Sequence, residues 1–278
     1  MAIIQSKGRL LDLSSPVVMG ILNATPDSFY NKGQLSDPES LSRNAEKMLK
    51  DGATILDIGG ASSKPGQEIM SAEEELQRVI PAITAVHREF PEAWLSVDTY
   101  NARVAREAVW AGASIVNDIS SGRFDAEMLR TVAALRVPYI AMHMQGTPKT
   151  MQMEPHYDDV AWEVRDYLRL VVDECSAGGI TDIIVDPGFG FGKTVEHNFD
   201  LLRSLHTLRI LGRPVLAGLS RKSMICKALR VNPEHALNGT TALNMVALQQ
   251  GANILRVHDV REAMEVVKLW GILVESQK

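Results

Sequence analysis

Polar and ionisable side chains recur where short apolar runs of the chain end. Eight such runs begin near residues 17, 54, 94, 115, 139, 183, 214 and 254. Each finishes on a side chain that can hydrogen bond: Asn23, Asp57, Asp98, Asn117, His143, Asp186, Ser220 and His258. One polar residue of this kind would only mark where a strand meets solvent. Eight in succession predict a ring of functional groups, provided that the runs are strands whose carboxyl ends share one face.

Cations gather at the last two of these ends. Arg256 and His258 are two residues apart, so on a strand they point to the same side. Ser220 and Lys222 have the same spacing within the basic run 220–223. Barrels often bind phosphate at the ends of their seventh and eighth strands, and we expect a phosphate site here. A solvated surface cluster is the alternative interpretation.

Asp98, Asn117 and Asp186 form a group of the opposite character. Their oxygens could hold a hard metal ion, since such ions prefer oxygen ligands. No cysteine or histidine lies beside them at the spacing of metal ligands. They could equally accept paired hydrogen bonds from a heterocycle rich in N–H donors. The residues alone leave both possibilities open.

Residues 187–194 nearly match the phosphate-binding loop G-x-x-x-x-G-K-[ST]. Pro187 stands at the first required glycine, and proline has no backbone N–H to donate to a phosphate. We therefore expect a flexible pocket wall in which Phe191 offers a stacking surface. Two polar loops, 25–33 and 61–66, are predicted to close over a bound substrate.

Segments with helical spacing separate the apolar runs, and the clearest are 71–87, 101–111, 125–135, 157–177 and 262–274. Alternation of strand and helix predicts a parallel sheet, because parallel strands need crossover connections. Eight units in one chain favour an α/β fold of the (β/α)8 barrel type. An open doubly wound sheet is the alternative, but it would normally carry a glycine fingerprint after the first strand. No linker divides the chain, so we expect a single domain over residues 1–278.

The composition excludes several classes of protein. The 278 residues are 45% hydrophobic and 23% charged, values that exclude a disordered chain or a disulfide scaffold. Acidic residues outnumber basic ones by 34 to 29, which argues against a general nucleic-acid binder. No apolar run reaches the roughly 18 residues of a membrane helix, and the first residues do not resemble a signal peptide. The two cysteines, Cys175 and Cys226, suit the reducing cytoplasm.

Taken in order, several segments resemble the signatures of the dihydropteroate synthase family. They are residues 19–29, 57–66, 96–99, 117–118, 142–146, 186–193, 220–223 and 256–258. The resemblance therefore extends over nearly the whole chain, from about residue 17 to residue 260. It implies a (β/α)8 barrel and a folate-pathway transferase. Enzymes of this family join 4-aminobenzoate to 6-hydroxymethyl-7,8-dihydropterin diphosphate, and they release diphosphate and 7,8-dihydropteroate.

The resemblance also implies roles for individual residues. The pterin positions of the family match Asp98, Asn117, Asp186 and Lys222, with Met142 and Phe191 nearby. Its diphosphate positions match Asn23, Arg256 and His258, and its aminobenzoate positions match Ser63, Lys64, Pro65 and Ser220. Mg2+ is the implied cofactor with Asn23 as its ligand, and Asn23, Lys222, Arg256 and His258 are the implied catalytic residues. The family further implies a homodimer with small-molecule substrates.

Substitution in this family resembles a dissociative reaction in which diphosphate leaves before the amine attacks, so no strong general base is expected. The chain departs from the family in both loops. Asn31 and Lys32 replace an aspartate and a glycine, and Lys64 replaces an arginine and its bidentate fork. A non-catalytic pterin-binding protein is therefore one alternative, and a methyltransferase of the related methyl-tetrahydrofolate barrels is another. The cations at 220–222, 256 and 258 disfavour both alternatives, because neither needs a diphosphate clamp.

Overall fold

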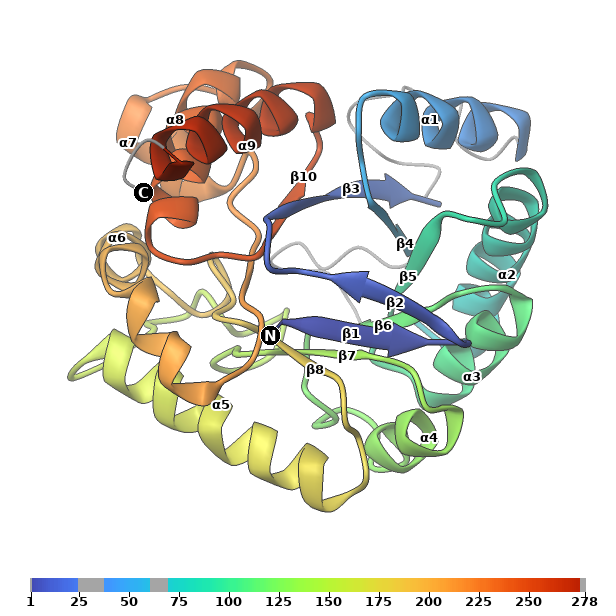
Figure 1. Cartoon of the computed structure of the whole chain (residues 1–278). Coiled ribbons are helices and arrows are strands. Elements are labelled where there is room, and N and C mark those ends of the chain that lie inside the picture. Colours follow the sequence, from blue (N-terminus) through green and yellow to red (C-terminus); the bar gives the residue numbers. More distant parts are fainter. Residues whose placement is uncertain (1, 25–37, 61–69, 276–278) are drawn as a thin grey trace.

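A parallel sheet of eight strands, surrounded by helices, organises the chain (Figure 1). The structure is a computed structural model and describes residues 2–24, 38–60 and 70–275. The barrel strands are β3 (Val17–Asn23), β4 (Ile55–Gly59), β5 (Trp94–Asp98), β6 (Ile115–Asp118), β7 (Tyr139–Met142), β8 (Ile183–Asp186), β9 (Leu216–Ala217) and β10 (Ile254–Val257). The α-helices are α1 (Pro38–Lys50), α2 (Ala72–Glu89), α3 (Ala102–Ala111), α4 (Met128–Leu135), α5 (Val160–Ala177), α6 (Val195–Arg203), α7 (Ser223–Leu229), α8 (Leu237–Gln249) and α9 (Val260–Glu275). Two 3-10 helices, η1 (Leu205–Leu211) and η2 (Pro233–His235), lie between them.

The sheet closes on itself. Its strands follow the order β8-β7-β6-β5-β4-β3-β10-β9, and every neighbouring pair is parallel. A parallel bridge between Val185 and Val215 joins the two ends of this order, and the Val185 amide donates to Pro214 O at 2.9 Å. The predicted (β/α)8 barrel is confirmed, and the open sheet is excluded.

The five predicted helices are present, and each begins within three residues of its expected position. Ser71 caps α2: its Oγ accepts from the Glu74 amide at 3.3 Å, and the Glu74 carboxylate accepts from the Ser71 amide at 3.4 Å. This reciprocal pair is the capping box that the sequence indicated. Within residues 2–24, 38–60 and 70–275, no helix has an apolar stretch long enough to cross a membrane.

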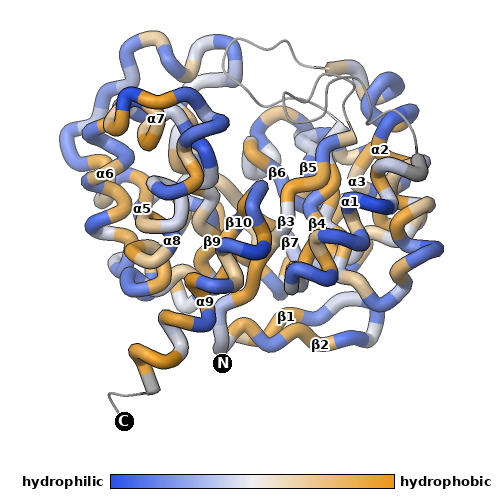
Figure 2. The backbone as a smooth tube through the Cα atoms, turned by 90° about the horizontal axis from the view of Figure 1, so that it is seen from above, coloured by the Kyte–Doolittle hydropathy of each residue, from blue (hydrophilic) through white to orange (hydrophobic). Residues whose placement is uncertain are grey.

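An antiparallel hairpin, β1 (Ile3–Ser6) and β2 (Arg9–Asp12), precedes the barrel and was not predicted. Figure 2 shows it beneath the amino ends of the barrel strands. Ile4 and Leu13 bury their side chains against a layer supplied by all eight strands, which we call the floor. The floor residues are Met19, Ile55, Trp94, Ile115, Ile140, Ile184, Leu216 and Ile254.

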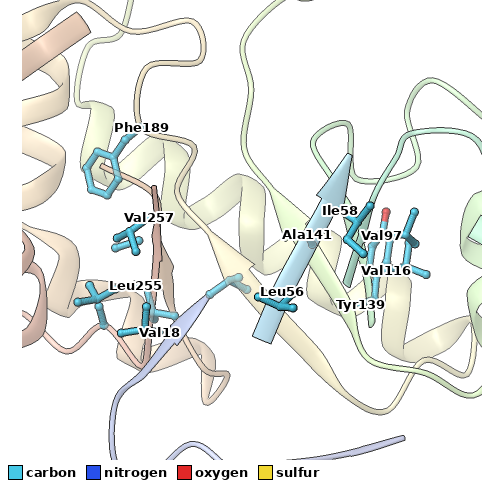
Figure 3. Packing of buried hydrophobic residues seen from close by; sticks show 14 of the residues in the cluster. Val18, Leu56, Ile58, Val97, Val116, Tyr139, Ala141, Phe189, Leu255 and Val257 are labelled. Carbon is cyan, nitrogen blue, oxygen red and sulfur yellow. The ribbon is translucent and has the colours of Figure 1, made fainter. Parts of the chain in front are cut away.

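A second apolar cluster fills the space between the sheet and the helices (Figure 3). Strand residues next to those of the floor face outward into it, and Leu56, Leu95 and Leu255 are examples. Because each strand is buried on both faces, its residues are apolar on both, as is typical of parallel sheets. An inward-facing polar residue is therefore an exception, and such exceptions locate the site.

Candidate active site

Just above the floor, the barrel interior becomes polar. Side chains alternate along a strand, so the inward position after each floor residue lies two residues further on. Two residues beyond Ile55, Ile115, Ile184 and Ile254 stand Asp57, Asn117, Asp186 and Arg256 respectively. The next inward layer, about 7 Å further along the strands, is therefore polar and charged where the floor is apolar.

Arg256 lies at the centre of this charged layer. Its Nε donates to Asp57 Oδ2 at 2.6 Å, and its Nη2 donates to Asp98 Oδ2 at 2.6 Å. Asn117 Nδ2 also donates to Asp57 Oδ2, at 3.0 Å. Burial disfavours the guanidinium charge, but Asp57 and Asp98 outweigh it and raise the pKa of Arg256. Four strands that are distant in sequence therefore meet in one network, as the strand-end pattern predicted.

Asn23 lies level with the acidic group. Strand register pairs Asn23 with Gly59, Gly59 with Asp98, and Asp98 with Asn117. A Cβ at Gly59 would come 3.3 Å from the Cβ of Asp98. Glycine at this position therefore lets the Asp98 side chain pack closely against the backbone of β4.

The carboxyl groups of Asp98 and Asp186 are poorly solvated. Burial raises the pKa of Asp98 to about 7, although the Arg256 charge opposes this shift. Burial also raises the pKa of Asp186, and Lys222 opposes it. The Gly188 amide donates to Asp186 Oδ1 at 2.7 Å. Each carboxyl group can thus gain stability from further hydrogen-bond donors on a ligand.

Lys222 and the aromatic wall stand beside Asp186. The Lys222 ammonium donates to Phe189 O and lies 4.8 Å from the centre of the Phe191 ring. Burial lowers the pKa of Lys222 to about 8, against the opposing charge of Asp186. Met142 and Phe191 belong to one small apolar cluster at the carboxyl ends of β7 and β8. The site therefore has apolar side chains and a cation as well as acids.

Ser220 and His258 form a second group at the ends of β9 and β10. Ser220 Oγ lies 3.0 Å from His258 Nδ1, and the His258 amide donates to Ser220 Oγ at 3.2 Å. Partial burial and the Arg256 cation lower the pKa of His258 to about 4, so the ring is neutral at pH 7. Arg221 points elsewhere, because its Nε and Nη2 donate to Asp259 at 2.8 and 2.6 Å.

Three of the predicted site residues, Ser63, Lys64 and Pro65, lie outside the described residues, as do Asn31 and Lys32. Among the described residues, no group of three His, Cys, Asp or Glu side chains could hold a metal ion. The Asn23 carboxamide oxygen is a hard donor of the kind that Mg2+ accepts, but one donor does not make a site. An ion here would need further oxygens from a ligand such as a phosphate.

Two residues of the site were missed as site residues. Asp57 was recognised as a polar strand end, yet it holds both Arg256 and Asn117 in place. Lys193 was set aside with the phosphate-loop motif, although its ammonium is buried behind the pocket wall. The alternation of inward and outward positions along the strand would have identified Asp57 as an inward residue. The sequence holds no signal for the partners of Lys193.

Comparison with known proteins agrees with this geometry. The family described as pterin binding enzyme matches residues 19–258. The dihydropteroate synthase of Haemophilus influenzae is 45% identical over 267 residues, which are 95% of this chain and 96% of the relative.

Solved structures give the same result. The Yersinia pestis dihydropteroate synthase with a sulfonamide drug superposes with a TM-score of 0.94 at 42% identity, covering 98% of this chain and 99% of that one. The Xanthomonas albilineans dihydropteroate synthase was solved with 4-aminobenzoic acid (TM-score 0.91, 42% identity, 98% and 97% covered). It was also solved with 7,8-dihydropteroate (TM-score 0.87, 40% identity, 98% of each chain covered).

Proposed function

Because the chain belongs to the dihydropteroate synthases, a family of pterin binding enzymes, we propose how its barrel mouth performs their reaction. This reaction joins 6-hydroxymethyl-7,8-dihydropterin diphosphate to 4-aminobenzoate and gives 7,8-dihydropteroate and diphosphate. The observation that carries the proposal is the position of Arg256. It contacts two acids of one half of the mouth and lies two residues from His258 in the other half.

The acidic half binds the pterin. An aminopyrimidinone ring presents several N–H donors along one edge, and Asp98, Asn117 and Asp186 offer oxygens to receive them. Lys222 donates to an acceptor of the ring. Met142 and Phe191 pack against its faces, because an aromatic heterocycle gains from apolar contact and offset stacking. The raised pKa values of Asp98 and Asp186 support this role, since the donors of the pterin relieve the poor solvation of both carboxyl groups.

The cationic half binds the diphosphate. Asn23, Arg256 and His258 surround the position where the leaving group would lie, and the neutral His258 donates from Nε2 while Nδ1 is held by Ser220. Ser220 and residues 63–65 bind 4-aminobenzoate. Magnesium bound with the diphosphate would neutralise leaving-group charge, and Asn23 is the residue that would hold it.

Substitution proceeds by departure before attack. The bond between the pterin methylene carbon and the bridging diphosphate oxygen breaks, and its electron pair stays on oxygen. The resulting cation is delocalised over the pterin ring. The amine nitrogen of 4-aminobenzoate then forms the new C–N bond and loses a proton to water. Catalysis rests on stabilising the leaving group and positioning the amine, so a strong base is unnecessary.

The cellular setting is inferred on separate grounds. Cys175 and Cys226 are both free thiols, which supports a cytoplasmic location. Large apolar side chains stand exposed on α9, among them Leu269 at 57% and Ile272 at 64%. A second copy packed on this face would remove these side chains from water, and their exposure therefore supports a homodimer.

Diphosphate release from the purified protein tests the proposal. Release should require the pterin substrate, 4-aminobenzoate and magnesium together. His258→Gln should raise the dissociation constant for the pterin diphosphate at least tenfold while changing that for the pterin alcohol less than twofold. Equal losses for both ligands would contradict the clamp. Exposed His235→Gln is the matched control and should behave as wild type. Tight pterin binding without any release would instead identify a binding protein.

A further inference from the structure

The segment that resembles a phosphate-binding loop lies beside the proposed pterin site, and we call its residues 188–192 the wall. From Gly188 to Gly192, every backbone carbonyl accepts a hydrogen bond from a side chain. The donors are Lys193 for Gly188 and Phe191, Lys222 for Phe189, Gln152 for Gly190 and Tyr157 for Gly192. Side chains donate to all five carbonyls, whereas about two-thirds of protein hydrogen bonds join backbone to backbone.

Lys193 supplies two of these bonds from inside the protein. Its side chain is 3% exposed, and Nζ lies 2.9 Å from Gly188 O, 3.1 Å from Phe191 O and 2.9 Å from His143 Nδ1. Burial lowers the pKa of Lys193, and Asp186 opposes this shift. In the charged form, the three ammonium hydrogens reach Gly188 O, Phe191 O and, in the His143 tautomer protonated at Nε2, the Nδ1 of His143.

His143 is the neutral partner that makes this arrangement possible. Burial and the nearby Lys193 charge lower the pKa of His143 to about 2, so the ring is neutral. In the tautomer protonated at Nε2, Nδ1 accepts from Lys193. The ring also packs edge-on against Tyr167, with 4.9 Å between centres. His143 directly follows β7, so the ammonium of Lys193 ties the wall to a strand end of the barrel.

Glycine allows the wall to approach that strand end. Gly188 has a φ of +67°, and a Cβ there would lie 1.9 Å from His143 O. Gly192 has a φ of +63°, and its Cβ would lie 2.5 Å from Gln145 O. Both positions exclude larger residues on steric and conformational grounds. The fold thus brings the wall close enough for the Lys193 side chain to span it.

The pocket side of the same wall carries three contacts of the pterin site. The Gly188 amide holds Asp186, the Phe189 carbonyl holds Lys222, and the Phe191 ring faces the Lys222 ammonium. A shift of the wall would move all three together. Lys193 contacts the wall at backbone carbonyls, and its contact with Phe191 is to the carbonyl and not to the ring that faces the site. It therefore acts through the wall.

We propose that Lys193, held by His143, is the positioning residue for pterin recognition: its buried ammonium fixes the wall that places Asp186, Lys222 and Phe191. The motif lysine that contacts phosphate in nucleotide-binding loops here binds backbone carbonyls. This inference rests on the pterin site proposed above. It assigns the wall no contact with 4-aminobenzoate, so the two substrates should respond differently to its loss.

Steady-state kinetics on Lys193→Met test the inference. The substitution keeps the apolar stem and removes all three donors. The KM for the pterin diphosphate should rise at least tenfold, while the KM for 4-aminobenzoate should change less than twofold. Exposed Lys50→Met on α1 is the matched control and should leave both constants unchanged. Equal rises in both KM values, or no rise in either, would overturn the inference.

A milder variant covers the case in which Lys193→Met does not fold. His143→Leu removes one of the three acceptors and should raise the pterin KM about threefold in the same selective manner; an unselective change would count against the inference. Calorimetry on Asp186→Asn tests the pterin site separately from the positioning role of Lys193. Retained pterin affinity in Asp186→Asn would remove the proposed site and this inference with it. Lost affinity there, with wild-type affinity in both Lys193→Met and His143→Leu, would refute the positioning role alone.

Discussion

The two ends of the barrel are built from the same strands and differ in nearly every physical respect. At the amino ends, the floor is a layer of apolar side chains closed by Ile4 and Leu13 of the hairpin segment. At the carboxyl ends, the next inward layer contains Asp57, Asn117 and Arg256, with Asp98 above it. A spacing of two residues along each strand separates the layers.

This difference shows that the floor stabilises the fold, whereas the buried charges of the mouth reduce its stability. Burial of apolar surface at the floor stabilises the fold by about 25 cal/mol per Å2. Burial at the mouth instead raises the pKa values of Asp98 and Asp186, because the charged forms are poorly solvated there. The mouth is thus held in a strained electrostatic state by a scaffold whose stability lies elsewhere, which is a common property of binding sites.

Replacing an acid of the mouth should separate binding from stability most strongly. In Asp186→Asn, one carboxylate oxygen becomes an NH2 group that faces the donors of the pterin, and two charge-assisted contacts are lost. At about 2 kcal/mol each, pterin affinity should fall about a thousandfold. Thermal stability should not fall, since a poorly solvated charge is removed. Isothermal calorimetry and thermal unfolding measure the two quantities.

Exposed Asp158→Asn is the matched control and should change neither quantity. A loss of stability in Asp186→Asn comparable to its loss of binding free energy would mean that the mouth also supports the fold. The contrast between the two ends would then fail.

The floor and the mouth also differ in how well they could be predicted from the sequence. Apolar runs and helical spacing were sufficient for the eight strands, for five of the nine described α-helices and for the barrel. The hairpin was not predicted because each of its strands has only four residues, and apolar and polar residues do not alternate in their sequences. At the mouth, residue types indicated which strand ends matter. They did not indicate that Arg256 would contact Asp57, 199 positions away, because that choice depends on barrel closure and strand register.

Truncation at the floor should give the opposite result to Asp186→Asn. Ile4 is 1% exposed, and Ile4→Ala leaves a cavity beneath the barrel that its neighbours fill only in part. We expect a loss of about 3 kcal/mol in the free energy of unfolding, measured by urea denaturation, with kcat/KM unchanged at temperatures where the protein is folded. Ile3→Ala, on the same strand but 41% exposed, should lose far less. A fall in kcat/KM for Ile4→Ala would show that the floor positions the site.

A poorly solvated carboxyl group also occurs in the helical layer, at Glu75 of α2. Its side chain is fully buried, and neither carboxyl oxygen has a hydrogen-bond partner in the part of the chain that the structure describes. Burial raises the pKa of Glu75 to about 7; the nearby Thr99 side chain opposes this shift, and the charges of Asp98 and Asp118 add to it. Between about pH 4.5 and pH 7, Glu75 therefore carries a proton in the folded protein. In the unfolded chain, where its carboxyl pKa is the ordinary value of about 4.5, that proton has already been released.

The stability associated with Glu75 is thus complete below about pH 4.5 and is lost as the pH rises through about 7. Glu75→Gln keeps a neutral group of the same shape at every pH. We expect it to be about 3 kcal/mol more stable than wild type at pH 8 and nearly equal at pH 4.5, as measured by urea denaturation at both pH values. Glu73→Gln, an exposed position in the same helical turn, should show no such dependence. Equal effects of Glu75→Gln at both pH values would mean that Glu75 does not titrate in this range, and the poorly solvated charges would then be confined to the mouth itself.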